Sequence, residues 1–121
     1  MPAGLRIELF PEDPYLVADF YARVLRFAVE STGGDDPYVS LTRGTVRIGL
    51  SGRPVPVDPA LRRPPVGTEI VLEVDDLDTE YAAVVESGWP IDAPLTERPW
   101  GLRDFRIVDP AGYYLRITHR P

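Results

Sequence analysis

Charged side chains of both signs recur on one face of the segments in which apolar and polar residues alternate. Residues 5–10 and 69–74 show this alternation most clearly, and it is typical of a strand with one buried face. Carboxylates beside guanidinium groups could transfer protons and stabilise an oxyanion. Because neighbouring guanidinium groups favour ionised carboxylates, the pattern favours binding of a polar ligand over acid–base catalysis. The charged residues assigned to this face are Arg6, Glu8, Arg47, Glu69, Glu73 and Arg116.

The residues that other common reactions need are absent or poorly placed. The chain has no cysteine, which excludes a thiolate nucleophile, a thiolate metal site and a disulfide framework. Its one histidine, His119, lies next to the C-terminus, so we expect a frayed surface residue and no Ser-His-Asp arrangement. The pair Gly33-Gly34 lacks the spacing of a phosphate-binding loop. We therefore expect no catalytic residues.

The overall charge excludes some partners. The chain of 121 residues carries a formal net charge of −6, whereas nonspecific binding to a phosphate backbone needs a basic face. We therefore expect no nucleic-acid partner and a long-range preference for cationic ligands. No apolar run reaches the roughly 20 residues of a membrane-spanning helix, and the N-terminus lacks a signal-peptide pattern. The expectation is a cytoplasmic protein with no membrane partner.

The elements that must position the charged face follow one order in the first half of the chain. The strand at 5–10 precedes an amphipathic helix over 15–27, for which Asp13 is the expected N-cap. Two strands at 38–42 and 45–50 then form a hairpin.

The second half repeats this order. It has a strand at 69–74, a helix that begins at 75–78 and ends at Gly88, and strands at 104–108 and 113–118. The repeat predicts an α+β fold of two βαβββ modules that form a curved mixed or antiparallel sheet, with the helices on its outer face.

The two modules are expected to make a single domain. Module one covers about 4–51 and module two about 68–119, and a Pro-rich linker of about 52–67 joins them. Trp89 is expected to cap the core beside the second helix. The predicted core residues are Leu5, Ile7, Leu9, Val46, Ile48, Leu50, Ile70, Leu72, Val74, Leu115 and Ile117.

Three segments resemble a known family. Residues 19–27, the strand end at 74–78 and the run at 99–112 resemble the vicinal oxygen chelate superfamily, the group of glyoxalases, bleomycin-resistance proteins and extradiol dioxygenases. The third run contains Pro99-Trp100-Gly101 and Asp109-Pro110-Ala111-Gly112 and is the specific part. The resemblance covers nearly the whole chain.

Metal-dependent members of this superfamily hold a divalent cation with a His on the first strand and a Glu on the last strand of each half. By resemblance these positions fall at Arg6, Glu69, about Gly49 and Arg116. A guanidinium has no lone pair to offer, glycine has no side chain, and one carboxylate does not make a stable centre. We therefore expect neither a metal nor another cofactor.

The branch without metal ligands resembles the bleomycin-resistance proteins, which are small acidic homodimers that sequester a drug in crevices between subunits. In that branch the Trp of a Trp-Gly motif stacks on flat heteroaromatic parts of the ligand, which implies this role for Trp100. Packing of Trp100 on its own subunit stays open. The expected ligand-binding residues are Trp100, Gly101, Phe10, Tyr38, Tyr114, Arg6, Glu8, Arg47, Glu69, Glu73 and Arg116.

The leading hypothesis is a non-catalytic homodimer that sequesters a bulky, partly aromatic antibiotic or related natural product, with a lean toward a cationic one. One alternative is a lyase, isomerase or oxygenase of the same superfamily with an atypical or absent metal. Another is an accessory domain that works in a protein complex. A stoichiometric divalent ion that survives dialysis would favour the enzyme. The Pro-rich loop at 53–66 is expected to act either as a lid or as part of the dimer contact.

Overall fold

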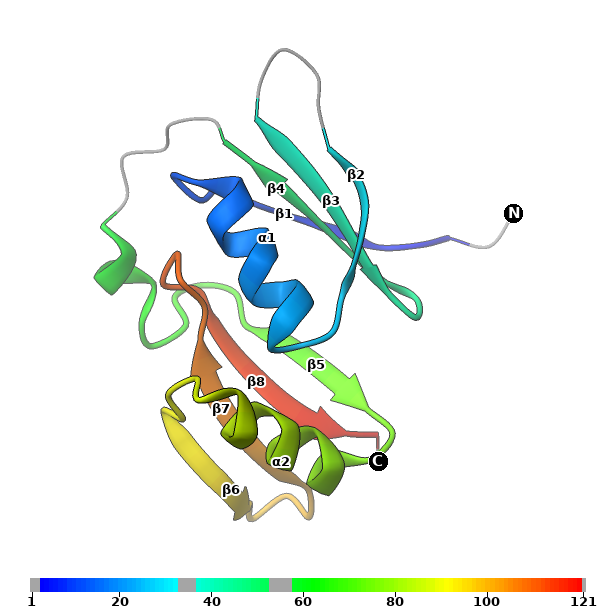
Figure 1. Ribbon diagram of the computed structural model, residues 1–121. Helices are drawn as coiled ribbons and strands as arrows, with labels where there is room; N and C mark the ends of the chain where they lie inside the picture. Colours follow the sequence, from blue (N-terminus) through cyan, green and yellow to red (C-terminus); the bar gives the residue numbers. More distant parts are fainter. Residues whose placement is uncertain (1–2, 33–36, 53–57, 121) are drawn as a thin grey trace. The chain divides into compact units, whose positions relative to one another are not determined.

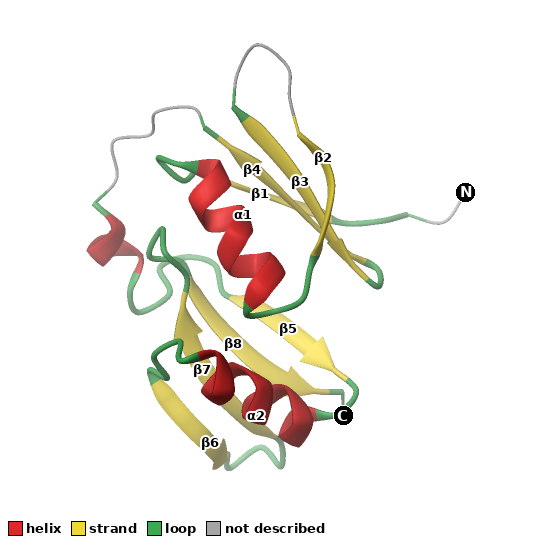
Figure 2. Ribbon diagram, viewed as in Figure 1, coloured by secondary structure: helices red, strands yellow, loops and turns green. Residues whose placement is uncertain are grey.

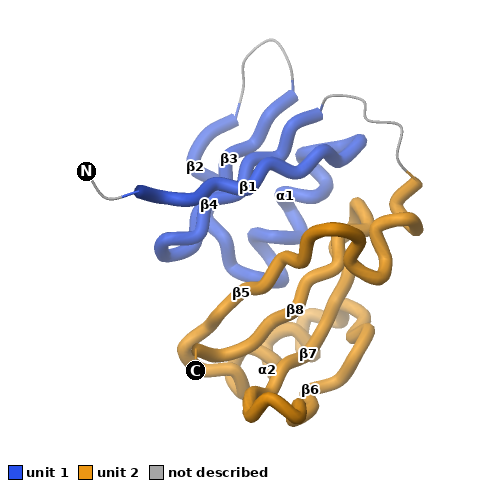
Figure 3. The backbone as a smooth tube through the Cα atoms, turned by 180° about the vertical axis from the view of Figure 1, so that it is seen from behind, with its two compact units in different colours: residues 1–56 blue, residues 57–121 orange. Residues whose placement is uncertain are grey.

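The computed structural model describes residues 3–32, 37–52 and 58–120. The chain divides into two compact units, residues 1–56 and 57–121 (Figure 3). In its described residues each unit has one α-helix and one four-stranded mixed sheet (Figure 1, Figure 2). The predicted α+β fold of two βαβββ modules is confirmed.

The first unit places its helix on one face of its sheet. Its elements are β1 (Arg6–Leu9), α1 (Pro14–Arg23), β2 (Ala28–Thr32), β3 (Tyr38–Arg43) and β4 (Val46–Ser51). The strand order is β1-β4-β3-β2, in which β1 is parallel to β4 and the other neighbours are antiparallel. Because Leu9 is buried in the core, the alternation along β1 directs Glu8 to the opposite face.

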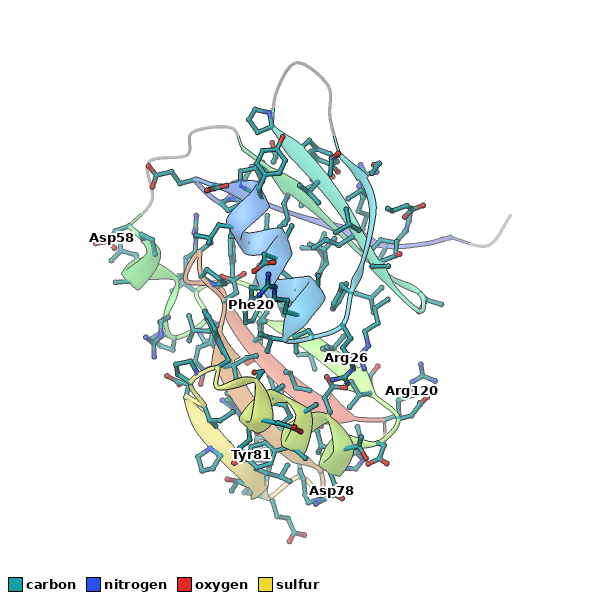
Figure 4. All side chains as sticks on the ribbon, in the orientation of Figure 1. Phe20, Arg26, Asp58, Asp78, Tyr81 and Arg120 are labelled. Atoms are coloured by element: carbon teal, nitrogen blue, oxygen red, sulfur yellow. The ribbon has the colours of Figure 1, made fainter. Side chains whose placement is uncertain are left out.

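The second unit repeats this topology. Its elements are a short 3₁₀ helix (Pro59–Arg62), β5 (Ile70–Val74), α2 (Leu77–Ser87), β6 (Ala93–Glu97), β7 (Arg103–Val108) and β8 (Tyr114–His119). The strand order is β5-β8-β7-β6, with β5 parallel to β8 and the rest antiparallel. Tyr81 of α2 (labelled in Figure 4) packs edge-on against Phe105 of β7, with 5.0 Å between ring centroids.

Both helices begin where the sequence predicts. The carboxylate of Asp13 accepts hydrogen bonds from the N–H groups of Tyr15 and Leu16, and that of Asp76 accepts one from Thr79. Gly88 ends α2 in the left-handed conformation, as expected. The predicted end of the first helix, at 27, was wrong, because α1 ends at Arg23.

The core contains most of the predicted apolar residues. The prediction of Leu5 was wrong: β1 begins only at Arg6, so Leu5 lies outside the ladder and is 75% exposed. Four further buried residues lie at the centre of the two sheets and were not among the predicted core residues. They are Val39 and Leu41 of β3 and Phe105 and Ile107 of β7.

Two strands have no clear sequence signal. Every residue of β2 is exposed, and β6 has no fully buried residue. Both are edge strands that pair on one side only, with β3 and β7 respectively. An edge strand with little burial shows little alternation of apolar residues, so backbone pairing alone defines it.

The second part of the Pro-rich linker packs on the second unit. Arg62 donates to the carbonyl of Ala111, and its guanidinium lies 4.2 Å from the centroid of the Tyr113 ring. Residues 53–57 of the predicted loop lie outside the described residues, as do residues 33–36, which include Gly33-Gly34. Neither helix in the described part of the chain is long and apolar enough to cross a membrane.

Candidate ligand-binding site

The polar face of the second unit contains an open cavity of about 390 Å³. Two neighbouring strands and one loop line it. β5 and β8 place Val71 opposite Arg116 and Glu73 opposite Thr118. The lining residues are Val71, Glu73, Trp100, Leu102, Arg116 and Thr118. Charged groups therefore sit beside apolar surface, which suits a ligand that has both characters.

Trp100 presents its ring at the cavity from the loop between β6 and β7. The loop is closed by backbone hydrogen bonds from Arg98 N–H to the Leu102 carbonyl and from Gly101 N–H to the Arg98 carbonyl. Gly101 has φ of 90°, a conformation that glycine adopts without steric cost. The turn leaves Trp100 56% exposed, which is unusual for so large an apolar side chain.

Trp89 has a different role. Its indole N–H donates to the carbonyl of Val108 at 2.9 Å, and its side chain is partly buried at the end of α2. This agrees with the predicted packing position beside the second helix. The two tryptophans of the unit thus differ, because one is tied to the strand β7 and the other faces solvent at the cavity.

The charges around the cavity are unevenly paired. Arg116 forms an ion pair with Glu69 at 2.6 Å through one terminal nitrogen, while its Nε is buried without a hydrogen-bond acceptor. Glu73 has no ion-pair partner among the described residues. Beside Arg116, burial works against the charge of Arg106, but hydrogen bonds to Asp104 and Tyr114 raise the pKa of that guanidinium.

The polar face of the first unit is organised around Glu8. One oxygen of its carboxylate accepts a hydrogen bond from the Tyr38 hydroxyl at 2.9 Å and contacts Arg6 Nε at 2.8 Å. Burial, followed by the hydrogen bond to Glu8, raises the pKa of Tyr38. Tyr38 is therefore a proton donor at neutral pH rather than a base.

Gly49 makes this arrangement possible. A Cβ atom at this position would lie 2.2 Å from both the second carboxylate oxygen of Glu8 and the Tyr38 oxygen. That second oxygen is buried and has no hydrogen-bond partner. The Glu8 carboxylate therefore occupies the space that a side chain on β4 would fill.

The structure brings some predicted site residues together and separates others. Arg6, Glu8 and Tyr38 form one cluster, and Glu73, Trp100 and Arg116 share the cavity, with Glu69 bound to Arg116. Gly101 shapes the Trp100 turn and does not line the cavity.

Three other predicted residues belong neither to the Arg6, Glu8 and Tyr38 cluster nor to the cavity lining. Phe10 follows β1 and is 36% exposed, and Arg47 is an exposed residue opposite Arg6 in the β1–β4 ladder. Tyr114 lines a separate open hollow of about 430 Å³ with Arg63 and Asp92.

Three cavity residues were missed by the sequence analysis: Val71, Leu102 and Thr118. Val71 and Thr118 occupy alternating positions on the same face as Glu73 and Arg116, so alternation along β5 and β8 could have found them. Neither residue is charged or aromatic, which were the side-chain types predicted to bind the ligand. Leu102 lies in a loop and has no periodic signal.

In this chain, the positions that correspond to the metal ligands of the vicinal oxygen chelate superfamily cannot hold a metal ion. Arg6 and Arg116 are cations already paired with carboxylates, and Gly49 offers no donor. Within residues 3–32, 37–52 and 58–120, no three His, Cys, Asp or Glu side chains are grouped so that they could hold a metal ion. We therefore derive no chemical step through a metal.

The expectation for His119 was wrong. It is a half-buried residue of β8 and not a frayed one. Its Nε2 lies 3.3 Å from the backbone N–H of Arg103 and accepts that hydrogen bond, and its Nδ1 lies 3.1 Å from the Arg120 carbonyl. Pairing of β8 with β5 and β7 orders this end of the chain.

Solved structures share this fold. TioX from Micromonospora sp. ML1 is 22% identical, with a TM-score of 0.80 and coverage of 99% of this chain and 100% of the other. The bleomycin resistance determinant encoded on the transposon Tn5 is 24% identical, with a TM-score of 0.79 and coverage of 98% of both chains. A bleomycin-binding protein complexed with bleomycin is also 24% identical, with a TM-score of 0.79 and coverage of 99% and 100%.

At these identities the structural likeness establishes the fold alone. No curated protein sequence matches the chain. The sequence profile of one family does match, and it spans residues 5–117, which include both units. The chain belongs to the Glyoxalase/Bleomycin resistance protein/Dioxygenase superfamily.

Proposed function

We propose that this protein is a non-catalytic binding protein that sequesters a bulky, partly aromatic antibiotic or related natural product. The observation that carries the proposal is the exposed Trp100 ring at an open cavity, where the apolar side chains of Val71 and Leu102 lie beside the charged Glu73 and Arg116. A rigid aromatic face beside apolar side chains contributes contact area at little entropic cost. An exposed tryptophan held by a closed turn is therefore a suitable anchor for a flat ring.

The charges of the cavity set the polarity of the ligand. Glu73 lines the cavity without an ion-pair partner in the described part of the chain, and the whole chain carries a net charge of −6. Both favour a cationic group on the ligand, near enough to Glu73 for a direct contact. Long-range attraction of this kind weakens as salt is added.

The comparisons support this reading in its general form. One structural neighbour is a bleomycin-binding protein in complex with bleomycin, and another is a bleomycin resistance determinant. Their shared fold is compatible with binding without catalysis. The ligand class given for this chain is our proposal and does not follow from the ligand that those neighbours bind.

The binding unit is proposed to be a homodimer in the cytoplasm. The support is the resemblance to a branch whose members are acidic homodimers. Light scattering at micromolar concentration tests it, and the expected mass is twice that of the chain. A monomer at that concentration would exclude a site shared between subunits.

The function is tested by fluorescence titration with a panel of antibiotics that includes bleomycin. The Trp89→Phe variant leaves Trp100 as the one tryptophan, so its emission reports on the cavity directly. We expect saturable quenching by at least one cationic aromatic compound. The matched Trp100→Phe variant retains only Trp89 and should show little quenching. Quenching that is equal in both variants would show that the compound does not bind at the cavity.

A further inference from the structure

Two arginines stand directly opposite each other on the cavity face of the second unit. Arg106 of β7 pairs with Arg116 of β8 in the antiparallel ladder. Opposite residues in such a ladder point to the same face, with Cα atoms about 4.5–5.5 Å apart. Like charges at directly opposite positions destabilise a sheet. The pair therefore calls for an explanation other than stability.

The nearby carboxylates do not accept hydrogen bonds from all N–H groups of the two arginines. Asp104 is nearly fully buried and is shared, because Arg98 contacts it at 3.0 Å and Arg106 at 3.4 Å. The second contact of Arg106 to Asp104 is 3.5 Å, the upper limit for a hydrogen bond. Arg106 also bonds to Tyr114. It thus binds weakly to a carboxylate that is already engaged.

Arg116 is also incompletely paired. Its one acceptor among the described residues is Glu69, which it reaches through a single terminal nitrogen. Its Nε–H is buried with no acceptor. Three guanidinium groups, of Arg98, Arg106 and Arg116, thus share the carboxylates of Asp104 and Glu69 in this part of the face.

We propose that Arg106 and Arg116 form an oxyanion subsite that binds a carboxylate group of the ligand. A guanidinium presents its donors in a planar fork that matches a carboxylate, and a carboxylate between the two arginines would remove their mutual repulsion. Arg116 lines the cavity together with Trp100, so one molecule can place its carboxylate on the arginines and its ring on the indole. This inference rests on the proposed binding function and names the chemistry of its ligand.

The subsite makes the expected ligand amphoteric. Glu73, on β5 at the same cavity, would receive a positive group, and the two arginines would receive a negative one. A ligand with only a positive charge would leave the arginine pair uncompensated. Arg106 is then a specificity-determining residue that stands next to Arg116 at the edge of the cavity.

The test uses the full chain and two probes of the same shape, 2-naphthylacetate and its neutral amide. Calorimetry should give about tenfold tighter binding of the carboxylate. In ¹⁵N spectra, the Nε–H signals of Arg106 and Arg116 should shift and saturate with the carboxylate and not with the amide. Arg103 lies on β7 like Arg106, but it pairs with the exposed Asp78 (labelled in Figure 4). Its Nε–H signal is the control.

Variants separate a specific contact from a general charge effect. Arg106→Gln should abolish the preference for the carboxylate, and Arg106→Lys, which keeps the charge without the fork, should restore only part of it. Arg103→Gln removes the same charge from the same strand and should keep the preference. An equal loss in Arg106→Gln and Arg103→Gln would show nonspecific attraction and overturn the subsite.

The failure of this inference differs from the failure of the proposed function. Equal affinity for the two probes, or no saturable shift of either arginine at millimolar carboxylate, overturns the oxyanion subsite. Quenching of Trp100 by an antibiotic would leave the proposed function standing in that case. Arginine shifts without any antibiotic binding would instead support the subsite and contradict sequestration.

Discussion

The two units of this protein share one topology, but their polar faces differ. In the first unit, Gly49 of β4 leaves room for the Glu8 carboxylate, which binds the hydroxyl of Tyr38 and the guanidinium of Arg6. In the second unit, the long side chain of Arg116 on β8 borders an open cavity with Trp100. The missing side chain of Gly49 lets the first face pair one oxygen of the Glu8 carboxylate, although the other oxygen is buried without a partner. The second face keeps the unpaired Nε–H of Arg116 and an exposed indole ring. We therefore propose that the second unit is the one that binds the ligand.

The largest effect is expected from Gly49→Val. The new Cβ would collide with the Glu8 carboxylate and the Tyr38 hydroxyl, and Gly49 is buried, so the cluster must come apart. We expect a loss of about 3 kcal/mol in the free energy of unfolding, at the upper end for overpacking. Urea denaturation measures it. Gly49→Val combined with Glu8→Ala should lose less than the sum of the two single variants, and strict additivity would refute the close approach.

Trp100→Ala should affect binding and spare stability. An anchoring aromatic residue contributes roughly 1–3 kcal/mol, so the affinity for a ligand found in the antibiotic panel should fall by that amount. The midpoint of urea unfolding should change little, because the side chain is largely exposed. Leu16→Ala, an exposed apolar residue on α1 of the first unit, is the control and should bind normally. Unchanged affinity in Trp100→Ala would reduce the tryptophan to a packing residue.

The smallest effect is expected at alkaline pH. The pKa of Tyr38 is raised on folding, chiefly by burial and then by Glu8, so the folded state holds this proton more tightly than the unfolded state. The stabilising contribution is complete below the unfolded pKa of tyrosine and is lost as the pH rises through the folded value. Between neutral and strongly alkaline pH, the free energy of unfolding should therefore fall less for Tyr38→Phe than for the native chain. Urea titrations of both proteins at each pH measure the difference.

A second readout isolates the cause of the Tyr38 shift. Tyrosinate absorbance measured for the native chain, minus that of Tyr38→Phe, gives the titration of this one hydroxyl. Glu8→Gln should lower the pKa of Tyr38 toward the ordinary tyrosine range, because the hydrogen bond to a charged acceptor is lost. An unchanged titration would mean that burial alone causes the shift.

Local sequence signals predicted the order of elements well. Asp13 could be recognised as an N-cap, and residues 75–78 as a helix start, because the groups that Asp13 and Asp76 satisfy lie within three residues along the chain. Gly88 could be recognised as a helix end because only the backbone of its own turn decides its conformation. The errors fall where local signals are weak. The edge strands β2 and β6 bury too little to show a period, and Leu5 continues an alternating pattern beyond the end of its ladder.

The candidate site was only partly predictable. Alternation along β5 and β8 correctly put Glu73 and Arg116 on one face, since side chains of a strand point to opposite sides in turn. Alternation cannot show which strands are neighbours, so the opposition of Arg106 and Arg116 and the shared use of Asp104 were not seen. Val71 and Thr118 lie on that same face, but only the structure shows that both line a cavity with Trp100.

The sequence alone thus determined the two βαβββ modules, the helix starts, the acidic charge and the absence of cysteine chemistry, because each depends on neighbours along the chain or on composition. Tertiary structure decided how the charges are shared. Glu8 lies over Gly49, Asp104 lies between two arginines, and Trp100 is held exposed by a turn. These outcomes depend on strand register and on the space left by residues distant in sequence, and no local pattern encodes either.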